Sequence, residues 1–275
     1  MIEVIDRVPT YPNRIKITRN DGTSEYVTWE RADEPTVEGT PINKALFDSI
    51  AEDQGLAAAK TVHVSSSGSD TLGNGTSTSP YATIAKALST LPKNLNGFDV
   101  TLQMTTGTYN EDVVVSGFFG GNIILSGASG VSVTIKSLTV ENGASFHLSS
   151  NISVGVSGSA GTAGIVVQQG KLLSFAQNVF VTAAQNIGVY VARGGFAVFG
   201  NLGVSNSKEV AVQVTGGATV YINSLLGTNN TGIAIQSGNG ARVGFNTKPI
   251  TAASTFLTMY GGRIYTGSQA DTPNY

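Results

Sequence analysis

Asparagine recurs in the second half of the chain at a nearly constant interval of about 23 residues, a period typical of stacked repeats. On both sides of each asparagine, apolar residues alternate with polar ones, which is the two-residue period of a strand with one buried face. A repeat of this length that keeps such a phase predicts a stack of similar β-units. The five asparagines are Asn151, Asn178, Asn201, Asn223 and Asn246.

The repeated asparagines are expected at the corners of this stack. Asparagine tolerates the left-handed backbone of a sharp corner, and stacked amides can hydrogen-bond in a ladder. We therefore predict that all five occupy equivalent corners of successive coils, with residues at odd offsets from them pointing inward. A β-sandwich also has short alternating strands, but it does not require a constant phase. The pattern favours an all-β fold, a right-handed parallel β-helix with one coil per period.

The composition agrees with a tightly turning β-protein and excludes several chemistries. Charged residues make up 12% of the chain, and 34 of its 275 residues are glycine. The chain has no cysteine, which excludes disulfides and thiolate catalysis. Its net charge of −2 and lack of a Lys/Arg cluster give no basic surface for nucleic acid or an anionic membrane. We expect neither a secretory signal at the N-terminus nor membrane insertion.

Residues 1–60 are expected to form a separate module. Alternating residues between positions 12 and 30 predict a β-hairpin. A helix then begins with Thr40 as N-cap and Pro41 in its first turn. This helix is too short to be stable alone, so its apolar stripe must be buried, either on the hairpin or against copies of itself in a trimer. The stripe, which is the candidate trimer interface, consists of Ile42, Leu46, Phe47 and Ile50.

The remaining chain divides into a capped solenoid and a tail. Residues 80–92 have helical apolar spacing and end at Pro92, and we expect this helix to cover the open first coil, as solenoid ends require. The β-helix domain is predicted over residues 61–256. Residues 257–275 leave the repeat and form a C-terminal tail.

Two stretches resemble known families. The first is similar to the N-terminal segment of tail-fibre or baseplate-associated proteins of phages and prophages that infect Gram-positive bacteria. Its matching residues are Val8, Pro9, Tyr11, Pro12, Asn13, Arg14, Ile15, Lys16, Arg31, Ala32, Asp33, Glu34, Pro35, Glu38, Gly39, Thr40, Pro41, Ile42, Asn43 and Lys44. The match covers about residues 8–50, and its most specific part is residues 38–44.

The second stretch resembles the segment that begins pectin-lyase-like β-helices, which occur in polysaccharide lyases, surface proteins and phage tailspikes. Its matching residues are Val62, Val64, Gly68, Ser69, Asp70, Gly73, Gly75, Thr76, Ser79, Pro80, Tyr81, Thr83, Ile84, Ala87 and Leu88. This motif is specific for the fold and says little about activity. Together the resemblances imply a homotrimer that attaches to the virion by its N-terminal part and directs its β-helix toward the host.

A glycosidase needs two carboxylates that face one scissile bond. After residue 100 the acidic residues are Glu111, Asp112, Glu141, Glu209 and Asp271. Adjacent residues in a strand point to opposite faces, so the first two cannot share a site. Glu141 and Glu209 are separated by nearly three coils, which predicts a stacked distance of about 14 Å. We expect no pair within one chain, and a pair from two subunits remains open.

Metal-dependent chemistry also lacks clustered ligands in the sequence. Calcium-dependent lyases need grouped aspartates, whereas Asp70 stands alone in a Gly/Ser-rich loop. His63 and His147 have no second ligand at metal spacing, so both are expected to be surface strand residues. We therefore predict no catalytic, cofactor-binding or metal-binding residue.

A saccharide site combines an aromatic platform with fixed polar groups. Tyr260, Arg263 and Tyr265 follow the last coil and form the best candidate glycan-binding group. The alternative is that these residues close the trimer or cap the C-terminal end.

The sequence thus predicts a structural phage tail-fibre or tailspike-like homotrimer that binds a host surface glycan without cleaving it. Its expected partners are copies of itself, baseplate or tail proteins through the N-terminus, and the host glycan. It would be made in the host cytoplasm and lie in the virion tail, outside the cell after lysis. The alternatives are a depolymerase tailspike, either a glycoside hydrolase or a polysaccharide lyase, and a bacterial adhesin, which the missing export signal disfavours.

Overall fold

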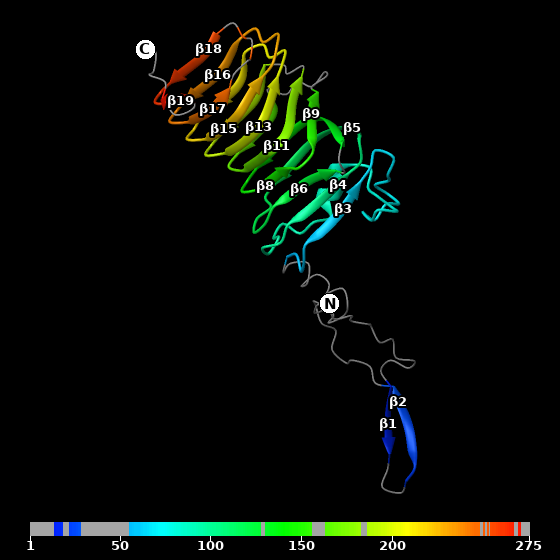
Figure 1. Ribbon diagram of the computed structural model, residues 1–275. Coiled ribbons are helices and arrows are strands. Elements are labelled where there is room, and N and C mark those ends of the chain that lie inside the picture. The colour runs from blue at the N-terminus through cyan, green and yellow to red at the C-terminus, as the bar shows by residue number, and fades with distance from the viewer. Residues whose placement is uncertain are drawn as a thin grey trace. The chain divides into compact units, whose positions relative to one another are not determined.

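The computed structural model describes residues 14–18, 22–28, 55–127, 130–155, 163–182, 186–247, 250, 252, 254–266 and 269–270 (Figure 1). The chain divides into two compact units, Met1–Gln54 and Gly55–Tyr275. The division falls a few residues before the predicted boundary at residue 60.

In the first unit, two strands form the predicted hairpin. β1 (Arg14–Thr18) pairs antiparallel with β2 (Ser24–Thr28), and Gly22 before the second strand has a φ of 83°. A turn of this kind needs positive φ, which glycine adopts without steric strain. The apolar stripe of Ile42, Leu46, Phe47 and Ile50 lies outside the described residues.

The second unit is a right-handed parallel β-helix of about six turns, as predicted. Most of its strands pair in parallel with the equivalent strand one coil away, as β4 does with β6 and β5 with β7. Among the described strands of this unit, β19 and β20 alone pair antiparallel. The strands are β3 (Lys60–Val64), β4 (Val100–Met104), β5 (Gly107–Ser116), β6 (Ile123–Gly127), β7 (Ser132–Glu141), β8 (Ser145–Leu148), β9 (Asn151–Gly155), β10 (Ala163–Gln168), β11 (Lys171–Thr182), β12 (Ile187–Ala192), β13 (Phe196–Val204), β14 (Val210–Val214), β15 (Thr219–Leu226), β16 (Ile233–Gly238), β17 (Arg242–Thr247), β18 (Ser254–Met259), β19 (Arg263–Thr266) and β20 (Gln269–Ala270).

Each coil contributes to three parallel sheets. Sheet A contains β3, β4, β6, β8, β17 and β19 with the first halves of β11, β13 and β15. Sheet B contains β9 with the first halves of β5 and β7 and the second halves of β11, β13 and β15. Sheet C contains the second halves of β5 and β7 with β10, β12, β14, β16 and β18. Figure 1 shows β11, β13, β15 and β17 stacked side by side.

The core is built from inward columns that continue from coil to coil. In sheet A one column keeps its register along the solenoid and every member is at most 1% exposed. Its members are Val100, Ile123, Phe146, Leu172, Ala197, Val220, Val243 and Ile264. Because side chains alternate along a strand, fixing this column inward also fixes the adjacent residues outward.

Most of the turns from sheet C back to sheet A repeat one backbone conformation. Arg193 and Gly194 take the left-handed conformation with φ of 52° and 73°, and Asn239 and Gly240 repeat it with 50° and 74°. Stacked turns bond to one another, since the Gly194 amide donates to the Gly216 carbonyl at 2.9 Å. A small residue follows each of these turns. At Gly195 an added Cβ would lie 2.6 Å from the Val167 carbonyl oxygen.

The predicted single column of asparagines is wrong for its last two members. Asn151, Asn178 and Asn201 share one register position, and the Asn178 amide donates to Asn151 Oδ1 at 3.1 Å. Asn201, however, is in register with Ser224. Asn223 therefore lies one residue earlier, where it accepts a 3.0 Å hydrogen bond from Asn246 Nδ2.

The prediction that residues at odd offsets from each asparagine point inward is also wrong beyond Asn151. The inward phase shifts by one residue at the corner between sheets A and B, where Phe199 is 1% exposed and Leu202 is fully buried. As a result, Val198 faces outward although it stands three residues before Asn201. Asn151 is the position where apolar residues at odd offsets are buried on both sides.

A buried asparagine outside the predicted set supports another corner. Asn230 is 6% exposed. Its Oδ1 accepts from the backbone amide and the hydroxyl of Ser207 at 3.0 and 2.7 Å, and its Nδ2 donates to the Val204 carbonyl at 2.9 Å. The side chain thus joins two coils where backbone pairing is interrupted.

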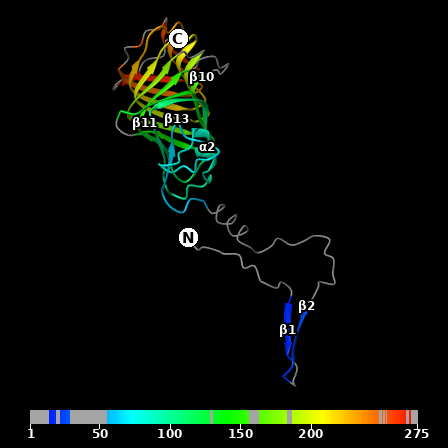
Figure 2. The ribbon, with the colours of Figure 1, turned by 90° about the vertical axis from the view of Figure 1, so that its right-hand side faces the viewer.

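The predicted N-terminal cap is present but shorter than residues 80–92. Helix α2 (Ile84–Ser89) begins after Thr83, whose hydroxyl oxygen accepts from the Lys86 amide at 3.0 Å. Ile84, Ala87 and Leu88 are buried against β3 and β5. Figure 2 shows α2 at the N-terminal, cyan end of the solenoid.

We predict that Asn230→Leu lowers the free energy of unfolding by about 2–4 kcal/mol, because the polar groups of Ser207 and Val204 lose their partner inside the core. The exposed Asn223→Leu should change it by less than about 1 kcal/mol. Urea denaturation of both variants measures the difference. Equal effects would show that the buried amide does not hold this corner.

Candidate binding groove

An open groove of about 570 Å³ runs along the outer face of sheet A and its corner with sheet B. It crosses successive coils from β11 to β19 and lies in the C-terminal half of the solenoid. It is lined by Phe175, Val198, Phe199, Gly200, Tyr221, Ile222, Asn223, Arg242, Gly244, Phe245, Asn246 and Tyr265.

Aromatic side chains form the walls of this groove. Phe175 is 63% exposed and Tyr221 is 52% exposed, although large aromatic side chains are usually buried in part or whole. The ring of Tyr221 meets that of Phe196 edge to face, with centroids 6.1 Å apart. Exposed rings held in fixed orientations by their neighbours can serve as stacking platforms.

A glycine makes room for a tyrosine ring in the outward column. Val198, Tyr221, Gly244 and Tyr265 stand in register on successive strands. A Cβ added at Gly244 would lie 3.0 Å from Tyr221 Cδ1, so a larger residue there would displace the ring. The two tyrosines are two coils apart, about 9.6 Å.

Planar polar groups stand beside the rings. Arg242 lines the groove and is in register with Arg263 on the next strand, and both side chains are exposed. On the other side, Asn223 and Asn246 join through their amides at 3.0 Å. Ring faces flanked by guanidinium and amide groups can hold a ligand that has both hydroxyl groups and apolar CH faces.

The structure places two of the three predicted glycan-binding residues at the groove and the third outside it. Tyr265 lines the groove, and Arg263 stands beside Arg242. Tyr260 is 81% exposed in the preceding turn, with a φ of 49°, and does not line the groove. Sequence reasoning missed Tyr221 and Arg242, although Val198, Tyr221 and Gly244 recur with the period of the repeat.

His147 lies at the margin of the groove. Its ring contacts the groove residue Phe175 edge to face, with centroids 5.7 Å apart, and its Nε2 is buried without a hydrogen-bond partner among the described residues. Burial lowers the pKa of His147 below its ordinary value of 6.5, Lys171 lowers it further, and Asp99 opposes both. His147 is therefore only partly the surface residue that the sequence predicts. His63 lies on β3, half-buried.

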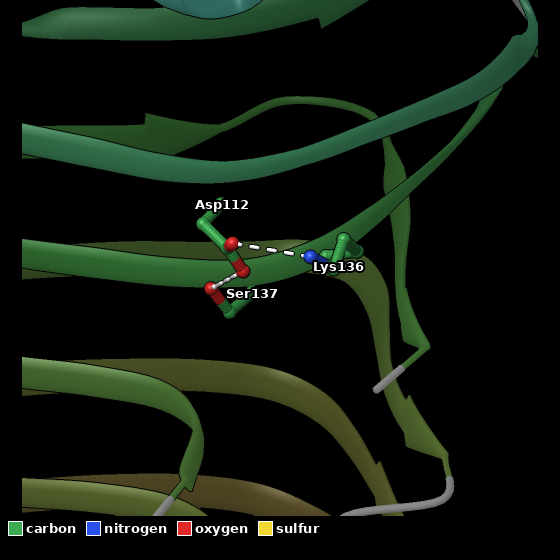
Figure 3. Close-up of polar contacts among 3 residues, drawn as sticks. All are labelled: Asp112, Lys136 and Ser137. Atoms are coloured by element: carbon green, nitrogen blue, oxygen red, sulfur yellow. Dashed lines mark hydrogen bonds and ion pairs between the residues drawn. The ribbon is translucent and has the colours of Figure 1, made fainter. Parts of the chain in front are cut away.

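Several acidic side chains are held by neighbouring groups. Asp112 accepts from the Ser137 hydroxyl at 2.7 Å and from Lys136 Nζ at 3.3 Å (Figure 3). The bond from Ser137 lowers the pKa of the Asp112 carboxyl, burial raises it, and Lys136 lowers it. Asp112 thus joins two adjacent coils of sheet C.

Two more carboxylates bind the start of the cap helix. Glu111 accepts from the backbone amides of Ile84 and Ala85 at 2.7 and 2.9 Å. Asp70 accepts from the Ala82 and Thr83 amides at 2.8 and 3.1 Å. These amides have no partner within a helix, so both acids stabilise the cap.

The predicted stacking of Glu141 and Glu209 is wrong. Glu141 is the last residue of β7, whereas Glu209 immediately precedes β14. The two acids therefore lie at opposite ends of sheet C, separated by the strand length as well as by the stacked coils. Asp271 lies outside the described residues.

Across the described part of the chain, no group of three or more His, Cys, Asp or Glu residues could hold a metal ion. No described helix is long and apolar enough to span a membrane. No protein-family model matches the chain, and no curated protein or solved structure is significantly similar to it.

The pKa of His147 predicts a pH-dependent stability. Because the folded-state pKa is lowered, the unfolded chain binds a proton first as pH falls through about 6.5, and the fold loses stability until pH reaches the folded pKa. The wild-type protein should therefore lose more stability than His147→Gln between about pH 7.5 and pH 5. Urea midpoints at the two pH values measure this, and parallel losses would contradict it.

Proposed function

We propose that the protein is a structural, homotrimeric component of a phage tail that binds a glycan on the host cell surface without cleaving it. The observation that carries this proposal is the groove on sheet A, where Tyr221 and Tyr265 stand beside Arg242 and two asparagines. A solenoid suits this task because it repeats outward columns on a rigid frame.

The attachment role rests on the N-terminal resemblance. Residues 8–50 are similar to tail-fibre and baseplate-associated segments, and the second unit begins with a motif similar to tailspike β-helices. Under the proposal, the first unit holds the protein on the particle and the groove faces the host. Three copies on one axis would raise a weak affinity at each groove through avidity.

The non-catalytic role is supported by the engagement of the acidic side chains. Asp70 and Glu111 bind the cap helix, and Asp112 joins neighbouring coils. Glu141 and Glu209 lie at opposite ends of sheet C, so they do not share one scissile bond within a chain. The competing proposal of a depolymerase needs a carboxylate pair from two subunits.

The trimer is tested by light scattering at micromolar concentration. We expect three times the chain mass of 28.3 kDa, with the stripe of Ile42, Leu46, Phe47 and Ile50 buried around the axis. Leu46→Asp should yield monomers because it places a charge in that stripe. Lys44→Asp, outside the stripe on the expected helix, is the matched control. A wild-type mass near 28.3 kDa would contradict the proposal.

Binding without cleavage is tested on purified host envelopes. The protein should sediment with the envelopes while the supernatant gains neither reducing ends nor unsaturated sugars, because the described residues that line the groove include no carboxylate and no histidine. Steady release of oligosaccharide that disappears in Glu141→Gln or Glu209→Gln would establish the depolymerase instead. Failure to sediment with envelopes or isolated glycans would refute the binding role.

A further inference from the structure

Acidic side chains outnumber basic ones in the N-terminal half of the chain, and basic side chains outnumber acidic ones in the C-terminal half. Residues 1–142 carry ten basic and sixteen acidic side chains, a net charge of −6, whereas the remainder carries six basic and two acidic side chains, a net charge of +4. These values sum to the overall −2. The groove therefore lies in a cationic half of an acidic protein.

The positive charge is concentrated at one edge of the groove. Arg242 and Arg263 are in register on adjacent strands, and Lys171 belongs to the same outward column of sheet A. Like charges directly opposite in a sheet repel one another. Neither arginine forms an ion pair with a described residue, so no acidic side chain in the described structure relieves this repulsion.

An anion bound between the guanidinium groups of Arg242 and Arg263 would relieve the repulsion between them. Arginine binds carboxylate and phosphate through parallel N–H donors, and successive coils place the two residues about 4.8 Å apart. The tyrosines lie on the same strands or adjacent ones, so a ligand could contact the charges and rings together. A second copy of the chain fits this surface poorly, because it would bring a further pair of arginines.

We propose that the ligand of the groove is an anionic polysaccharide, whose carboxylate or phosphate groups bind Arg242 and Arg263 while its sugar rings contact Tyr221 and Tyr265. This assignment rests on the proposed glycan-binding function and adds the chemical class of the glycan. The binding is consequently sensitive to ionic strength, because both arginines are exposed to solvent.

The test compares three polymers with one backbone: dextran, carboxymethyl-dextran and phosphorylated dextran. At an ionic strength of about 20 mM, the full chain should bind at least one anionic polymer about 10-fold more tightly than dextran. The preference should decline sharply by about 300 mM salt. The two anionic arms distinguish a carboxylate-bearing ligand from a phosphate-bearing one.

Arginine variants distinguish a specific anion-binding site from general attraction of the polymers to a cationic surface. The double variant Arg242→Gln, Arg263→Gln should abolish the preference. Arg193→Gln should keep it, and this control suits the turn because Gln169 takes the same left-handed conformation at φ 51° in the preceding turn. Unfolding midpoints of both variants confirm that they remain folded.

Equal binding of dextran and the anionic polymers, or equal losses in the two variants, would overturn the anionic assignment and leave glycan binding intact. Binding to none of the polymers and to no host glycan would overturn both. A change of oligomeric state in the double variant alone would show that a second copy covers the groove.

Discussion

Parallel pairing between successive coils is the interaction on which the rest of this structure depends. Each strand is stabilised by hydrogen bonds to the coils before and after it, so no coil is stable without its neighbours. The turn from sheet C to sheet A keeps these coils aligned, because Asn239 and Gly240 repeat the left-handed conformation of Arg193 and Gly194. Bonds between stacked turns add to the register.

This alignment makes the outer surface depend on single positions in the repeat. When the inward column of sheet A is fixed, the residues beside it form outward columns with the same spacing. Gly244 then makes room for the ring of Tyr221, which stands in register with it on the preceding coil. Sheet B uses a glycine in the same way, because the Phe180 ring lies over Gly203 as the Tyr221 ring lies over Gly244. The shape of the groove is therefore determined by which residues occupy the same outward position in successive coils.

The solenoid could be predicted from the sequence because the features that indicate it are local and recur in each coil. Alternating apolar residues, glycine turns and the helix from Ile84 all report on burial within a few positions. The register of the asparagines was not predictable in this way, since the inward phase shifts at the corner near Phe199 and Asn201. A shift of one residue reverses which side chains face outward, and the spacing of asparagines alone does not reveal it.

The binding site was predicted only in part for a related reason. Tyr265 and Arg263 stand close together in sequence and are predicted from it, whereas Tyr221 and Arg242 join them only through the stacking of coils. Asn230 is not predicted because it stands outside the asparagine repeat, although its side-chain amide forms three hydrogen bonds at a buried corner. Local composition identifies neighbours in the chain, and the coil register determines neighbours in space.

The assignment of the groove as the binding site is tested by the affinity of two tyrosine variants for host envelopes. Tyr221 lies in the groove, while Tyr190 is an outward residue of sheet C, in register with Gln213. Tyr221→Ala should weaken binding by about 10-fold or more, as expected for loss of a stacking ring, and Tyr190→Ala should leave it unchanged. Full binding by Tyr221→Ala, or an equal loss in both variants, would contradict the assignment of the groove.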